Sequence, residues 1–75
     1  MFLGSRLREL RTGKGLTQQK LGDLINVTKT SICYFEKNER CPNIDTLSDL
    51  CDIFEVSADY FLGRDIAAVA DNEIP

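Results

Sequence analysis

Apolar residues recur at helical spacing along most of the chain. Leu3, Leu7 and Leu10 lie four and three residues apart, so they form one stripe on a helix that ends around Gly13-Lys14-Gly15. No segment alternates between apolar and polar residues for long, so strands are not expected. The pattern therefore predicts an all-α protein.

Start signals divide the rest of the chain into further helices. Thr17 is a predicted N-cap, and the helix after it ends at Asn26, a residue that tolerates a positive φ. Thr28, Asn43 and Ser57 are the predicted N-caps of three more helices. Each of these three has an apolar pair at the spacing of a hydrophobic staple: Val27 with Ile32, Pro42 with Leu47, and Val56 with Phe61.

The chain is therefore predicted to form five short helices around one core. The second helix contains Leu21, Leu24 and Ile25, and the last ends at Gly63. This domain covers residues 1–64, and residues 65–75 form an acidic tail that is a frayed helix, a dimer contact or disordered. The fourth helix is expected to bury Ile44, Leu47, Leu50, Cys51 and Phe54.

Composition limits the classes of protein that fit. Seventy-five residues make at most one domain, no apolar run reaches the roughly 20 residues that span a bilayer, and the N-terminus lacks a signal-peptide layout. We expect a cytoplasmic protein without a membrane partner.

The net charge is -3, but residues 65–75 hold three acids and no base, so residues 1–64 carry nine acids and nine bases. Phosphate binding depends on local clusters of cations, so the net charge weakens a nucleic-acid hypothesis without deciding it.

The polar residues offer little for catalysis or metal binding. The chain has no histidine, and its cysteines, Cys33, Cys41 and Cys51, form no close pair, so three free thiols and no metal site are expected. No nucleophile has a base at hand, and a solvated helix face explains Asp45 and Asp49 with Asp52. We expect no enzyme, no cofactor and no small-molecule substrate.

The most informative segment runs from Leu16 to Arg40, where a short turn around Asn26 separates two short helices. Such a turn crosses the second helix over the first, and the second then projects a face that fits the DNA major groove. Its inward positions are Val27, Ile32 and Phe35. The outward positions, which either read bases or form a solvated surface, are Lys29, Thr30, Cys33 and Tyr34, with Ser31 at the edge.

From Leu3 to Gly63 the chain resembles the Cro/CI-type, λ-repressor-like helix-turn-helix family, also called the xenobiotic-response-element family. The resemblance covers about 60 residues in one register. The chain departs from the family pattern at Gly22, usually alanine, at Asn26 and Asn38, usually glycine, and at Lys20, Leu24 and Glu39. The matching pieces are Arg8-Glu9-Leu10-Arg11, Gly15-Leu16-Thr17-Gln18, Leu21, Val27-Thr28, Ser31-Ile32, Phe35-Glu36, Arg40, Pro42, Thr46-Leu47 and residues 56–63.

The resemblance implies roles for matching residues. Arg11 and Glu36 would form a partly buried salt bridge, and Gln18 would bind a phosphate and brace the recognition helix (about 28–37). The free N–H groups at the start of the second helix favour the same phosphate. The full set of expected phosphate contacts is Thr17, Gln18, Gln19, Ser31, Lys37, Asn38 and Arg40.

Together with the residues, the resemblance predicts a sequence-specific transcriptional regulator with double-stranded DNA as its partner, and it implies a bacterial or phage origin. It further implies a repressor that binds a palindromic operator as a homodimer. Tyr60 and Phe61, with Ile66 and Val69 in the tail, are the candidate dimer contacts. The alternative is a protein-interaction module, such as an antitoxin or antirepressor, and a protein antagonist also fits the regulator. The low net charge and the unusual Leu24 slightly favour this alternative.

Overall fold

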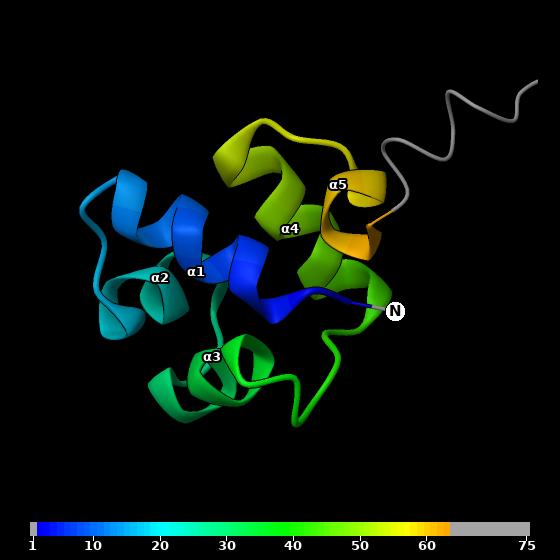
Figure 1. The fold of residues 1–75 in the computed structure, drawn as a ribbon. Helices are drawn as coiled ribbons and strands as arrows, with labels where there is room; N and C mark the ends of the chain where they lie inside the picture. The colour runs from blue at the N-terminus through cyan, green and yellow to red at the C-terminus, as the bar shows by residue number, and fades with distance from the viewer. Residues whose placement is uncertain (1, 64–75) are drawn as a thin grey trace, which may run out of the picture.

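The computed structural model describes residues 2–63, and within that range it contains five α-helices and no strand (Figure 1). The predicted fold class and the order of the helices are confirmed. The candidate dimer residues Ile66 and Val69, and the predicted tail at 65–75, lie outside the described residues. No helix in the described range is long and apolar enough to cross a membrane. The helices are α1 (Gly4–Gly13), α2 (Gln18–Ile25), α3 (Lys29–Glu36), α4 (Ile44–Phe54) and α5 (Ala58–Leu62).

Side-chain caps start three of the helices as predicted. The Thr17 hydroxyl accepts a hydrogen bond from the Lys20 N–H at 3.0 Å, which satisfies one free donor of the first turn of α2. Thr28 caps α3 and Asn43 caps α4 in the same way. Ser57 occupies the N-cap position of α5, but its side chain makes no capping hydrogen bond. The sequence therefore predicted the position of that start correctly and its hydrogen bond wrongly.

Left-handed residues end several elements. Asn26 ends α2 at φ 65°, and Asn38 follows α3 at φ 61°, as expected for asparagine where the family usually has glycine. Glu55 ends α4 at φ 57°, which the sequence did not indicate. After this residue the Val56 N–H donates to the Cys51 carbonyl at 3.1 Å, so a hydrogen bond at the end of α4 accompanies the left-handed conformation.

The core is a single apolar cluster to which all five helices contribute. Leu7 on α1 is fully buried, and α1 contacts both α3 and α5. The backbone N–H of Leu3 donates to the Phe61 carbonyl at 2.7 Å, and the Phe2 ring stacks on the Phe61 ring at 5.4 Å, so the N-terminus is tied to α5. The buried residues are Phe2, Leu7, Leu21, Ile25, Ile32, Phe35, Leu50, Phe54 and Phe61.

Two predictions about burial are wrong. Ile44 is 78% exposed rather than buried, because it occupies the first position of α4, ahead of the turns that pack on the core at Leu47 and Leu50. Phe61 is fully buried rather than available for a dimer contact, because Phe2 from the other end of the domain covers it.

Two glycines allow backbones to approach closely. A Cβ atom at Gly4 would lie 2.3 Å from the Phe35 carbonyl oxygen and 2.6 Å from that of Glu36, so α1 starts directly against the end of α3. A Cβ at Gly22 would lie 2.6 Å from the Val27 oxygen. Gly22, where the family usually has alanine, therefore accompanies a tight turn between α2 and α3.

Candidate nucleic-acid interface

Helices α2 and α3 form the predicted helix-turn-helix. Three residues, 26–28, connect them, and the Val27 N–H donates to the Gly22 carbonyl at 2.9 Å, which closes the end of α2. The two helices pack on each other more extensively than any other pair of helices in the described range. Figure 1 shows α2 and α3 in the lower left part of the view, with α1 lying above them.

The buried face of α3 agrees with the predicted pattern. Ile32 is fully buried and Phe35 nearly so, while Val27 in the turn before the helix is half-buried. The outward residues Lys29 and Thr30 are exposed at the start of the helix. The other residues of the expected reading face and its edge differ in exposure. Tyr34 is 38% exposed, and Cys33 and Ser31 are half-buried.

A polar network holds α3 in place. The Arg11 Nε atom lies 2.5 Å from Glu36 Oε2, and Arg11 Nη2 donates to Glu36 Oε1 at 3.3 Å. The side chains are only 12% and 5% exposed. The salt bridge implied by the family resemblance is thus present and largely buried, and it joins α1 to the last turn of α3. A buried pair of this kind fixes geometry more surely than it adds stability.

Gln18 connects α2 to the same network. Its Nε2 atom donates to Glu36 Oε1 at 3.1 Å, and Arg11 Nη1 donates to the Leu16 carbonyl just before α2 at 2.8 Å. Gln18 thus links the start of α2 to the end of α3, an arrangement that agrees with the second of the two roles that the resemblance implies. At the same end of α2, Thr17 caps the helix, and Gln19 is exposed and donates to Asp23 at 3.1 Å.

The remaining predicted phosphate contacts lie in the loop after α3. Lys37 and Arg40 are exposed, and the Arg40 guanidinium lies 5.6 Å from the centre of the Tyr34 ring. Asn38 has a role that the sequence did not reveal, because its Oδ1 accepts the Gly4 N–H at 2.8 Å. That oxygen caps α1 across 34 residues of sequence, so only the amide nitrogen of Asn38 remains for the predicted phosphate contact.

Charge is distributed unevenly between the two parts of the chain. Residues 2–42, here called the basic half, contain eight lysines and arginines against four acids. Residues 43–63, the acidic half, contain five acids and no base. All the predicted base and phosphate contacts lie in the basic half, so the net charge of the whole chain understates its local capacity to attract phosphate.

The cysteines are unpaired, as predicted. Burial, together with the neighbouring Asp52 carboxylate, raises the pKa of the Cys51 thiol, which packs beside the core. Residues 2–63 contain no group of three or more side chains arranged to hold a metal ion.

Comparison with known proteins places this geometry in a family. A helix-turn-helix family model matches residues 7–61. The transcriptional regulator ImmR of Bacillus subtilis is 38% identical over 65 residues, which cover 87% of this chain and 51% of ImmR. The transcriptional activator BcrR of Enterococcus faecalis is 34% identical over 74 residues, which cover 97% of this chain and 36% of BcrR. The chain thus spans about half of the first of these relatives and about a third of the second.

Among solved structures, the P22 c2 repressor in complex with a synthetic operator superimposes with a TM-score of 0.76. Its sequence is 30% identical, and the match covers 81% of this chain and 92% of the repressor chain. The family match and this structural likeness agree with the resemblance noted in the sequence. The chain therefore belongs to the Cro/CI-type helix-turn-helix family.

Proposed function

We propose that the protein is a sequence-specific DNA-binding transcriptional regulator that inserts α3 into the major groove. The observation that carries this proposal is the exposed start of α3, at Lys29 and Thr30, on a helix that a largely buried ion pair holds in place. Lysine can donate to guanine O6 or N7, and threonine offers a hydroxyl and a methyl group. The named functions of ImmR and BcrR, and the operator bound to the P22 c2 repressor, support it.

The other site residues have proposed roles in the same complex. Tyr34 and Cys33 complete the reading face, and Arg40 binds the DNA backbone beside Tyr34. Further phosphate contacts come from the start of α2 and from the edge and end of α3: Thr17, Gln18, Gln19, Ser31, Lys37 and Asn38. Such a regulator acts in the cytoplasm, on the nucleoid, and its activity requires neither catalysis nor a cofactor.

We further propose that it represses transcription as a homodimer on a palindromic site. Tyr60 remains a dimer contact, together with Ile66 and Val69, but the buried Phe61 is no longer a candidate. The Tyr60 ring is half-buried, and Arg6 covers one of its faces, with the guanidinium 4.5 Å from the ring centre. Only part of Tyr60 is therefore available to a second copy.

Selection of bound sequences from a random DNA pool tests the proposal, followed by titration of the selected duplex at several salt concentrations. We expect a palindromic site and an affinity that falls steeply as salt rises. Lys29→Ala and Thr30→Ala should change which bases are preferred, by roughly 1–3 kcal/mol for each lost contact. Arg40→Ala removes a charge as Lys29→Ala does, so it is the matched control, and it should weaken binding to all sequences alike.

A protein-interaction module is the second candidate function, and Leu24 favours it. This leucine is 59% exposed on α2, at a position where the family is often polar. Binding to DNA that is weak and flat at every salt concentration, with no sequence enriched from the pool, would support an antitoxin or antirepressor and reject the regulator.

A further inference from the structure

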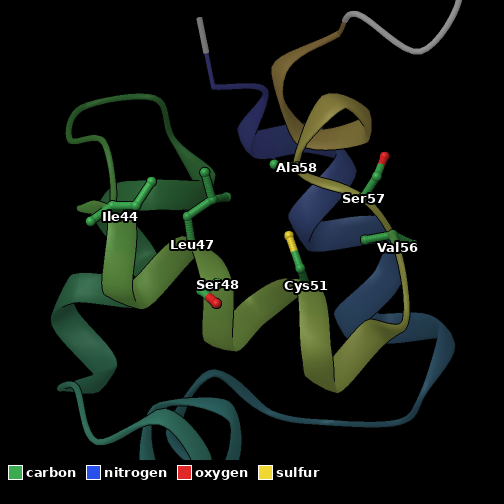
Figure 2. A pocket seen from close by; sticks show the side chains of 7 residues that line it. All are labelled: Ile44, Leu47, Ser48, Cys51, Val56, Ser57 and Ala58. Carbon is green, nitrogen blue, oxygen red and sulfur yellow. The ribbon is translucent and has the colours of Figure 1, made fainter.

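An apolar groove lies in the acidic half, away from the residues proposed to contact DNA. It has a volume of about 350 Å³ and runs along α4 and the start of α5 (Figure 2). Ile44, at one end, is the most exposed large apolar residue in the described range. The groove is lined by Ile44, Leu47, Ser48, Cys51, Val56, Ser57 and Ala58.

The groove has an acidic margin along one side. Asp45, Asp49 and Asp52 each follow directly after a groove residue of α4, and all three are exposed. One step along an α-helix turns the side chain by about 100°, so these three carboxylates occupy the row of α4 next to the groove. No lysine or arginine within residues 43–63 offsets them. The groove therefore combines an apolar floor with one strongly negative edge.

We propose that this groove binds a cationic amphipathic helix of a partner protein. From Ile44 to Cys51 the groove follows two turns of α4, about 10 Å, which matches apolar anchors one and two turns apart on a docked helix. Lysines or arginines beside those anchors face the carboxylates of Asp45, Asp49 and Asp52. The proposal does not depend on the DNA-binding function, since no groove residue lies on α2 or α3.

Charge argues against a second copy of this chain, and against the chain's own C-terminal segment, as the occupant of the groove. In a two-fold dimer through this groove the same face would meet itself, so the acids of one copy would lie against those of the other. The segment 64–75 contains an apolar stretch at 66–70, but it has three acids and one base and would bring further negative charge to the same edge. A cationic partner is the one occupant that gains from both features of the groove.

The test uses the full 75-residue chain, labelled with 15N, and a synthetic peptide of about 15 residues, near the shortest length that is helical alone. The peptide carries leucines on one helical face and lysines on the other, and a control peptide carries glutamates in place of the lysines. We expect amide shift changes confined to residues 44–58 with the lysine peptide, binding that weakens as salt rises, and no binding of the glutamate peptide.

Three variants separate the groove from general charge attraction. Asp49→Asn with Asp52→Asn should weaken peptide binding about tenfold at low salt, since it removes two facing charges. Glu9→Gln with Asp23→Asn removes the same charge from exposed positions on α1 and α2, and should change the affinity less than about twofold. Ile44→Ser should weaken binding about fivefold without unfolding the protein, since Ile44 is 78% exposed.

Several results would overturn the proposal. Equal losses for the two double variants, or shift changes scattered outside residues 44–58, would show non-specific attraction of a cation. A dimer in sedimentation equilibrium that Ile44→Ser dissociates would assign the groove to a second copy. Tighter peptide binding after Ile66→Ser with Val69→Ser would assign it to the chain's own C-terminal segment.

Discussion

The basic and acidic halves of the domain are held together in different ways. In the basic half, Arg11, Gln18 and Glu36 join three helices through nearly buried hydrogen bonds, and the exposed side chains of α3 project from that frame. In the acidic half, α4 and α5 rest on the core mainly through apolar side chains, and hydrogen bonds from Leu3 and Arg6 reach carbonyls of α5. These two helices leave an apolar groove open. A helix that must meet a partner in one orientation needs directional bonds. A pair of helices that closes the core depends mainly on apolar contact.

The largest loss of stability is expected when the polar network of the basic half is broken. Glu36→Ala leaves the Arg11 guanidinium buried without its partner, so we expect the free energy of unfolding to fall by about 3 kcal/mol. Urea denaturation measures the loss. Glu39→Ala, which removes an exposed carboxylate three residues away, should change stability by less than about 0.5 kcal/mol. Equal losses in the two variants would mean that the pair does not brace α3.

A smaller loss is expected where α1 meets the end of α3. Gly4→Ala places a methyl group against two backbone carbonyls, which cannot rotate away, so the domain should lose about 2 kcal/mol. Gly13→Ala is the matched control on the same helix, since nothing lies within 4 Å of its added Cβ. That variant should gain up to about 1 kcal/mol from helix propensity. A Gly4→Ala protein as stable as the parent would show that α1 and α3 are less closely apposed.

Within the acidic half, the two helix starts should differ by about 1 kcal/mol. Asn43→Ala removes a side-chain cap whose acceptor lies 2.8 Å from the Thr46 N–H, so it should lower stability by about 1 kcal/mol. Ser57 makes no such bond, so Ser57→Ala should be nearly neutral. Thermal unfolding of both variants measures the difference, and comparable losses would indicate that Ser57 also caps its helix.

The smallest effect concerns thiol reactivity. Burial and Asp52 raise the pKa of Cys51, so less thiolate is present at pH 8 and iodoacetamide should modify Cys51 more slowly than the exposed Cys41. As the pH rises toward the raised pKa, the rate at Cys51 should keep increasing. Mass spectrometry of partly modified protein measures each rate. Faster modification of Cys51 than of Cys41 at pH 8 would contradict its burial.

Local signals made most of the fold predictable. An N-cap residue acts within a few positions of the helix that it starts, so Thr17, Thr28 and Asn43 marked helix starts that the structure confirms. The faces of α3 followed from its periodicity. The Arg11–Glu36 pair came from the family resemblance, because spacing alone does not indicate which charges meet.

Long-range relations were not predictable from the pattern. Phe61 looked like a surface contact because nothing in its own helix shows that Phe2, 59 positions earlier, stacks on it. The Asn38 amide caps α1 across 34 residues, and no sequence rule pairs them. The left-handed Glu55 was not predicted either, because neither glycine nor asparagine marks the end of α4.

In the proposed complex, the exposed face of α3 meets DNA and no part of the acidic half does. The most direct measurement is an amide NMR titration of the 15N-labelled chain with the selected duplex. We expect the largest shift changes in residues 17–40, above all at Lys29, Thr30 and Tyr34. Changes concentrated in residues 44–62, with α3 unaffected, would contradict it.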